Sequence, residues 1–182
     1  MRKIRPYTMT VFSEHTVGIL NLISIVYTRR AINVESITAS ETSIPGVFKT
    51  TVVSYSDRAT MEKVVAQIEK AIYVIKAFLY TDDELIFQEI ALYKLPTSQL
   101  LDRESVERLI RTYNARILHI TSEFTVIEKT GQPQETEALY EELKDYGIRQ
   151  FVRSGRVCVT KDPIEHVSTY LAMRDREGNL TT

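Results

Sequence analysis

FSEHTVGILNLISIVYTRRAINVES, residues 12–36, is the stretch that decides the fold of the first half of this chain. Apolar residues that lead into it alternate with threonines, as in a half-buried strand: Tyr7, Met9 and Val11. Later apolar residues recur at helical spacing: Ile19, Leu22, Ile23 and Val26. The stretch therefore predicts a strand, a short polar loop, an amphipathic helix and a second strand that carries Asn33.

The predicted loop, Ser13 to Thr16, lies at the N-terminus of the predicted helix. Unpaired backbone N–H groups and the positive end of the helix dipole favour a carboxylate there. Gly18 would let the backbone approach a bound group closely. The structural alternative is that Thr16 only caps the helix and Asn33 only ends one, and spacing alone leaves both interpretations open.

The order strand, helix, strand, strand, helix, strand is predicted twice along the chain. In the first copy, a third strand over 47–55 precedes a helix that Asp57 or Thr60 could cap, and a last strand covers 74–80. The apolar face of that helix is predicted to contain Met61, Val64, Val65, Ile68 and Ile72. A short acidic break at 81–84 is the best candidate boundary.

The second copy begins with an apolar strand over 86–95. Asp102 is predicted to cap a helix with Val106, Leu109, Ile110 and Tyr113, and 116–121 is expected to pair with 124–130. Pro133 suits the first turn of a helix with Leu139, Leu143 and Tyr146, which Gly147 ends in a left-handed conformation before an extended segment over 148–159.

The fold class predicted from these patterns is α+β, with two ferredoxin-like βαββαβ domains. The predicted divisions are residues 1–82, residues 83–161 and a tail over 162–182. Ile164, Val167 and Leu171 have roughly helical spacing in that tail, so a short helix followed by disorder is expected. A sheet with helices on one face leaves its other face and edges to be buried, which favours side-by-side pairing of two first domains.

The composition excludes several classes of function. A net charge of −1 among 182 residues gives no basic face for nucleic acid. No apolar run is long enough to predict a membrane span or a signal peptide, so no membrane association is expected and the predicted location is the cytoplasm. Cys158 is the single cysteine, which rules out an intrachain disulfide and predicts a buried strand residue.

Residue types that carry catalysis are scattered. The three histidines, His15, His119 and His166, have no metal-pair spacing on one helix. No glycine-rich phosphate loop or nucleophile elbow is present. His119 is interpreted as an ordinary strand residue, and His166 is given no function. These patterns predict a chain that is not an enzyme and binds no metal.

GILNLISIVYTRRAINVESIT, residues 18–38, resembles the opening of the small regulatory subunit of acetohydroxyacid synthase, also called acetolactate synthase. QEIAL at 88–92 resembles the strand that opens the second domain of that family, and YGI at 146–148 with RSG at 153–155 resembles the segment that closes it. The resemblance implies an N-terminal ACT domain over residues 1–82, a C-terminal small-subunit domain over 83–161, and a homodimer formed through the ACT domain.

The resemblance further implies that two ACT domains bind a branched-chain amino acid, with valine as the first choice. One chain would contribute His15, Thr16, Val17, Gly18 and Ile19, and its neighbour would contribute Asn33 and Val34. The chain would hold no cofactor. It would activate a large catalytic subunit that uses thiamine diphosphate, magnesium and FAD, and it would confer feedback inhibition in valine, isoleucine and leucine biosynthesis.

Three departures from the family pattern bear on the effector. His15 stands where asparagine is frequent, Ala31 stands where a glycine usually precedes the Asn-Val-Glu-Ser run, and residues 43–46 fill a variable turn. The competing hypothesis is a stand-alone ACT-type amino-acid sensor, or an interaction domain that serves another enzyme. A small-molecule enzyme on the same scaffold would need a cluster of acids or bases with shifted pKa values.

Overall fold

The computed structural model describes residues 4–101, 103–164 and 166–179, and the chain divides into two compact units. Unit 1 contains the chain up to Ile86 together with the segment from Cys158 onward, and unit 2 is Phe87–Val157. The sequence placed the first division four residues earlier, after residue 82, and assigned 158–161 to the second domain. The last strand pairs with the strand that begins at Leu85, but its residues from Cys158 onward group with the N-terminal unit through contacts distant in sequence, such as the bond from Lys49 Nζ to the Cys158 carbonyl.

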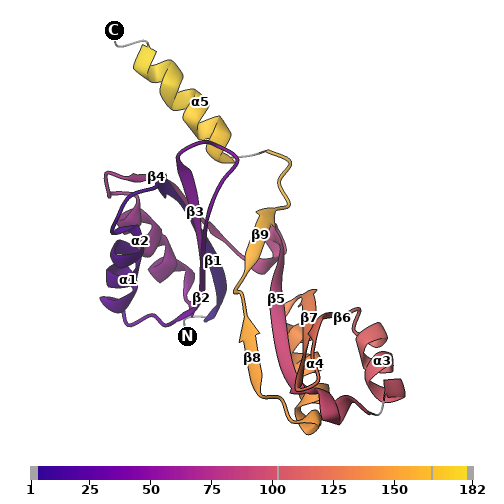
Figure 1. Ribbon diagram of the computed structural model, residues 1–182. Coiled ribbons are helices and arrows are strands. Elements are labelled where there is room, and N and C mark those ends of the chain that lie inside the picture. Colours follow the sequence, from indigo (N-terminus) through magenta and orange to yellow (C-terminus); the bar gives the residue numbers. More distant parts are fainter. Residues whose placement is uncertain (1–3, 102, 165, 180–182) are drawn as a thin grey trace. The chain divides into compact units, whose positions relative to one another are not determined.

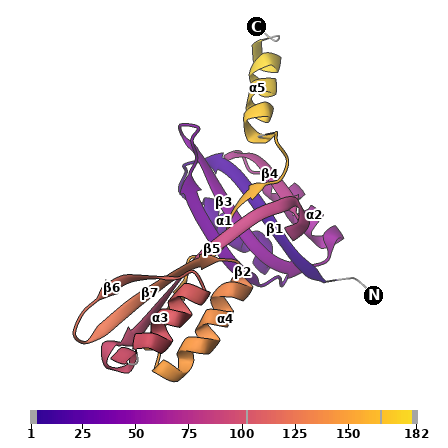
Figure 2. The same ribbon diagram turned by 90° about the vertical axis from the view of Figure 1, so that its right-hand side faces the viewer.

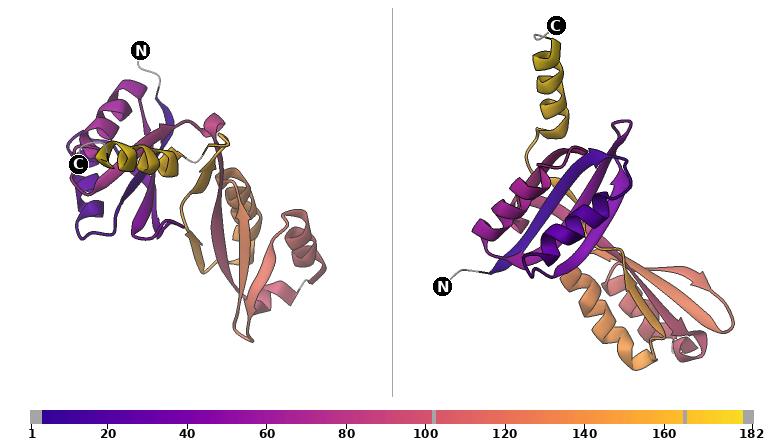
Figure 3. Two further views of the ribbon diagram at one scale, coloured as in Figure 1. Left: turned by 90° about the horizontal axis from the view of Figure 1, so that it is seen from above. Right: turned by 90° about the vertical axis from the view of Figure 1, so that its left-hand side faces the viewer.

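Unit 1 is a four-stranded antiparallel sheet in the order β2-β3-β1-β4, with both helices on one face (Figure 1; Figure 3, right panel). This is the predicted ferredoxin-like arrangement. Its elements are β1 (Arg5–Glu14), α1 (Ile19–Thr28), β2 (Val34–Glu41), β3 (Val47–Ser56), α2 (Arg58–Ile68) and β4 (Val74–Tyr80).

The core of unit 1 lies between the helices and one face of the sheet. Tyr7, Met9 and Val11 of β1 are buried there against Ile23 of α1 and Met61 of α2, which confirms the alternation and the helical spacing. One predicted core residue is wrong. Ile72 is 86% exposed, because α2 ends at Ile68 and the following turn leads the chain out to solvent.

Unit 2 repeats the same topology with the strand order β6-β7-β5-β8, and Figure 2 shows its two helices on one face of the sheet. The predicted hairpin, helices and left-handed Gly147 (φ 72°) are confirmed. The predicted cap, Asp102, lies outside the described residues. The elements of unit 2 are β5 (Leu85–Pro96), α3 (Arg103–Thr112), β6 (Arg116–Ile120), β7 (Phe124–Gly131), α4 (Pro133–Leu143) and β8 (Gln150–Arg153).

Three short 3₁₀ helices lie at the element junctions: η1 (Asp82–Glu84), η2 (Thr97–Leu101) and η3 (Lys144–Tyr146). The first of them forms the predicted acidic break. The Thr81 backbone N–H donates to Glu84 Oε2 at 2.7 Å, which closes the turn between β4 and β5. The break is therefore a tight, hydrogen-bonded turn and not a free linker.

A buried polar network joins β5, α4 and β8 inside unit 2. Glu89 Oε1 accepts from Thr136 Oγ1 at 2.5 Å and from Arg153 at 3.5 Å, and Tyr93 Oη donates to the Thr136 carbonyl at 2.6 Å. The Ile90 N–H donates to Ser154 Oγ at 3.0 Å. These contacts link the QEIAL segment to the RSG segment, so the two stretches singled out in the sequence stabilise one another.

The C-terminal part of the chain differs from the prediction. The expected extended segment over 148–159 forms two separate strands, β8 and β9 (Val157–Thr160). The tail helix, α5 (His166–Asn179), has 14 residues and runs through the stretch where disorder was expected. Helix formers such as Ala, Met, Arg and Glu populate that stretch, so local propensity favours the helix. Val167 and Leu171 lie on this helix, as their spacing predicted, and they pack with Phe12 and Val47, whereas Ile164 precedes the helix and is 55% exposed.

Candidate functional site

The loop between β1 and α1 is formed by residues 15–18, because β1 continues through Ser13 and Glu14. The predicted loop over 13–16 therefore began too early. Gly18 occupies the N-cap position of α1 with φ 99°, a left-handed conformation that glycine adopts without strain. No side chain caps this helix, and Thr16 Oγ1 donates instead to the Glu14 carbonyl at 3.3 Å. The interpretation of Thr16 as a helix cap is wrong.

A pocket of about 560 Å³ lies beside this loop. Its lining includes the consecutive residues His15, Thr16, Val17, Gly18 and Ile19, which the sequence assigned to an effector site. The first N–H groups of a helix have no intrahelical partner. Because no side chain caps α1, these donors and the positive end of the helix dipole remain available to an anion such as a carboxylate.

The other wall of the pocket comes from the sheet, through Ala39, Phe48 and Thr50. The His15 ring stacks on Phe48 with centroids 4.0 Å apart and ring planes 10° apart. Sequence reasoning missed these sheet residues. No local signal identifies them, because only the pairing of β1 with β3 places them beside the loop.

Asn33 and Val34 do not line this pocket, and both are exposed at the start of β2. Val34 pairs with Ser54, whereas Glu41 at the other end of β2 pairs with Phe48, which also pairs with Ser13. Asn33 and the loop therefore lie at opposite ends of the sheet within one chain. A site that contains both would need Asn33 from a second chain.

Two features of the titratable groups bear on catalysis: clusters of metal ligands and shifted pKa values. No cluster of three or more potential metal ligands exists among the described residues. Two carboxyl groups have lowered pKa values, because each accepts a hydrogen bond from a nearby threonine. The pKa of Glu84 is lowered mainly by the Thr81 backbone N–H, and that of Glu128 mainly by the Thr130 hydroxyl. His119 is exposed on β6, consistent with an ordinary strand residue.

Comparison with known proteins supplies the family. The acetolactate synthase small subunit of Bacillus subtilis is 31% identical over 166 residues, which cover 91% of this chain and 95% of that protein. The chain belongs to the acetolactate synthase small-subunit family. The small subunit of Mycolicibacterium smegmatis is 29% identical over 157 residues, covering 86% of this chain and 92% of that protein.

Two successive parts of the chain also match family models. Residues 9–76 match the ACT domain of the acetohydroxyacid synthase small subunit, and residues 88–162 match the small subunit of acetolactate synthase. The crystal structure of the small subunit from Thermotoga maritima superposes with a TM-score of 0.79 at 22% identity and covers 88% of this chain and 99% of that one. This chain therefore shares its fold with the Thermotoga maritima small subunit.

Among the residues that the structure describes, no helix has both the length and the apolar character that a membrane span requires.

Proposed function

We propose that this chain is a regulatory subunit that binds a branched-chain amino acid, first of all valine, between two ACT domains and transmits that binding to a large catalytic subunit. The loop pocket beside the uncapped N-terminus of α1 is the observation that carries the proposal. Its unpaired N–H groups suit the effector carboxylate. Val17 and Ile19 supply apolar surface beside them for a branched side chain.

The sheet topology supports a site shared by two chains. β2 is one of the two edge strands of the unit 1 sheet, the other being β4, so its outer backbone groups are available for pairing. Antiparallel pairing of two β2 strands about their centre would set Val34 of one chain near Glu41 of the other. Glu41 and Ser13 both flank Phe48, so this pairing would carry the partner's Asn33 towards the loop pocket. Its amide offers a donor and an acceptor to a zwitterion.

The large subunit of acetolactate synthase is the proposed partner, with thiamine diphosphate, magnesium and FAD held by that subunit. Activation and its reversal by valine need a coupling free energy of about 1–3 kcal/mol between the two sites. The match of residues 88–162 to the small-subunit model favours this partner over a stand-alone sensor, because a sensor would need only the ACT domain.

The test is reconstitution of the synthase from its large subunit and this chain, with acetolactate formation measured against valine concentration. Asn33→Ala should raise the valine concentration needed for half-inhibition about tenfold while leaving activation intact. Glu35→Ala, at another exposed position of the same strand, is the matched control and should behave as the unmodified chain. Loss of activation together with inhibition would show that Asn33 is structural and would remove it from the effector site.

A further inference from the structure

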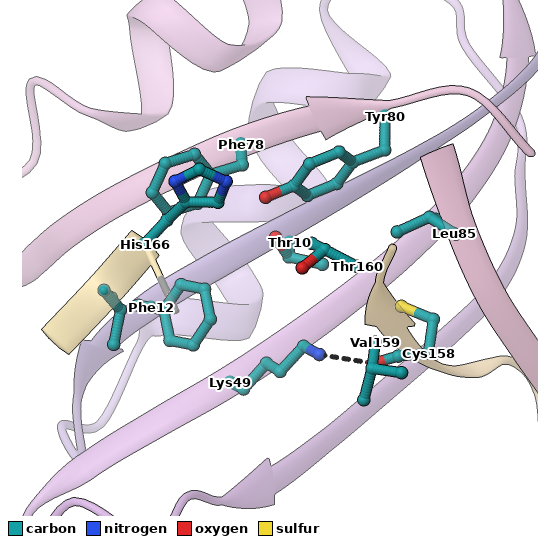
Figure 4. A pocket seen from close by; sticks show the side chains of 11 residues that line it. Thr10, Phe12, Lys49, Phe78, Tyr80, Leu85, Cys158, Val159, Thr160 and His166 are labelled. Carbon is teal, nitrogen blue, oxygen red and sulfur yellow. Dashed lines mark hydrogen bonds between the residues drawn. The ribbon is translucent and has the colours of Figure 1, made fainter. Parts of the chain in front are cut away.

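A second cavity lies on the face of the unit 1 sheet that α1 and α2 do not cover. It has a volume of about 130 Å³ and lies among β1, β3, β4 and the segment 158–167 (Figure 4). Thr10 and Phe12 belong to its floor, and they alternate along β1 with Met9 and Val11, which face the helices. It shares no lining residue with the loop pocket, so it is a separate site within unit 1.

Hydrogen-bond donors converge on this cavity. Thr10 is 3% exposed, and its hydroxyl has no hydrogen-bond partner among the described residues. Lys49 Nζ donates to the Cys158 carbonyl at 2.6 Å, and no carboxylate of the described chain lies within 4 Å of it. Figure 4 shows the Tyr80 and Thr160 hydroxyls directed towards the same space. None of the lining residues is Asp or Glu, and the nearby Asp162 carboxylate, which is not part of the lining, lies 3.1 Å from Nε2 of His166. A ligand ammonium would therefore meet the Lys49 ammonium and find no carboxylate in the cavity wall.

The remaining lining is largely apolar, with Phe12 and Phe78 on the sheet and Val159 and Val167 above it. An engineered cavity of about 150 Å³ binds benzene, so about 130 Å³ accommodates six or seven heavy atoms. A ligand that matches this lining has one anionic acceptor group and a short hydrocarbon body. An inorganic anion would leave the apolar surface without a partner.

We propose that this cavity binds a monocarboxylate of four or five carbons that lacks an amino group. Its carboxylate accepts hydrogen bonds from Lys49 Nζ and the Thr10 hydroxyl, and its hydrocarbon part packs against Phe12 and Phe78. The site differs in chemistry from the loop pocket, which faces the N–H groups of a helix terminus and whose proposed ligand is a zwitterion.

Two residues of the wall above the sheet, His166 and Val167, belong to α5. They lie beyond residue 162, where the match to the small-subunit family model ends. Val167 is buried against Phe12 and Val47, which holds the start of α5 over the cavity. Removal of α5 therefore opens the cavity to solvent without touching Lys49 or Thr10.

Isothermal titration calorimetry of the full chain with sodium 3-methylbutanoate tests the proposal, with 3-methylbutan-1-amine as the cationic probe of the same skeleton. The acid should bind and the amine should not. Lys49→Met and the isosteric Thr10→Val should each weaken binding of the acid by about tenfold. Lys63→Met, at an exposed lysine of α2, should leave it unchanged. Absence of acid binding, equal binding of the amine or of inorganic phosphate, or unchanged affinity in both cavity variants would overturn the proposal.

Competition and truncation separate this cavity from the effector site. Saturating valine should not displace 3-methylbutanoate, and displacement would mean that the acid occupies the loop pocket, against the proposal. A chain that ends at Asp162 should lose acid binding and keep its valine response, with circular dichroism to check that it folds. Undiminished acid binding by that chain would overturn the role of α5. Acid binding in a chain without a valine response would refute only the effector hypothesis.

Discussion

Within the part of the chain that the structure describes, two residues other than glycine hold left-handed conformations, and they occupy equivalent places. Ala31 (φ 52°) follows α1, and Asn114 (φ 48°) follows α3. In each case the next residue's N–H reaches back to the final turn, from Ile32 to the Tyr27 carbonyl and from Ala115 to the Ile110 carbonyl. Asparagine tolerates this conformation, whereas alanine is strained in it by about 1–2 kcal/mol.

Ala31→Gly should raise the free energy of unfolding by about 0.5–1 kcal/mol, because relief of strain exceeds the extra backbone entropy of glycine in the unfolded chain. Urea unfolding measures this. Ala59→Gly, inside α2, is the matched control and should lower stability by about 1 kcal/mol. If both variants were destabilised alike, the backbone at position 31 would not be strained.

Tyr27 is a buried phenol whose hydroxyl has no hydrogen-bond partner among the described residues, while the nearby Ser54 hydroxyl donates to Met61 Sδ at 3.7 Å. Burial raises the pKa of Tyr27 to about 12 from its ordinary value of 10. Ionisation is therefore easier in the unfolded chain. The stability that depends on the neutral phenol is complete below pH 10 and is lost as the pH rises towards 12.

Tyr27→Phe should leave the free energy of unfolding at pH 7 within about 1 kcal/mol of the unmodified chain, since no hydrogen bond is removed. At alkaline pH the variant should lose less stability, with a difference on the order of 2 kcal/mol by pH 12. Denaturant unfolding between pH 8 and pH 11 compares the two slopes. Parallel pH profiles would contradict the raised pKa.

At the scale of elements, helix N-termini in this chain are capped in different ways. α2 begins at Asp57, whose carboxylate accepts from the Thr60 N–H at 3.1 Å and from the Thr60 hydroxyl at 2.7 Å. α4 begins with a reciprocal pair between Gln132 and Glu135 and has Pro133 in its first turn. α1 has only Gly18 at this position. Of these three helices, α1 is the uncapped one, and it lies beside the loop pocket, where its donors can bind a ligand.

Asp57→Ala should lower the free energy of unfolding by about 1 kcal/mol, the usual effect of losing an N-cap acceptor. Thermal and urea unfolding would measure it. Asp83→Ala, at an exposed aspartate of η1, is the control and should change stability by less than about 0.5 kcal/mol. Equal effects of the two variants would assign the loss to charge and not to the cap.

At the scale of the whole molecule, both faces of the unit 1 sheet are covered by its own chain. The helices cover one face, and the segment 158–167 lies against residues of the other. What remains open is the edges of the sheet, β2 and β4. β2 presents Val34 and Ile37, which are partly exposed, at its edge. The proposed dimer therefore forms through the β2 edge and not through a face of the sheet.

Ile37→Lys should shift the dimer towards monomer, because edge lysines oppose strand pairing and would meet a like charge across the two-fold axis. Sedimentation equilibrium over a range of concentrations measures the shift, and valine inhibition should weaken in parallel. Ile72→Lys, at an exposed isoleucine outside the strands, is the control. A dimer unaffected by Ile37→Lys would place the contact elsewhere.

The short-range features of the fold were predictable. Alternation in β1, helical spacing in α1 and α2, the Asp57 cap and the left-handed Gly147 each arise from contacts within a few residues of the chain. The element boundaries that the sequence misplaced depend on contacts between residues that are distant along the chain. β1 outruns its predicted end because β3 continues to pair with it through Glu14, and the segment from Cys158 onward joins unit 1 by contacts that no local pattern encodes.

The sequence by itself determined the repeated α+β pattern, the family, and the loop that lines the candidate effector pocket, because each is written in neighbouring residues. Only the tertiary structure decided that Phe48 and Thr50 form the opposite wall, that Asn33 lies at the far end of the same sheet, and that Lys49 and Thr10 meet below α5. Strand register and the return of the C-terminal segment bring these residues together, and both result from the packing of the whole chain.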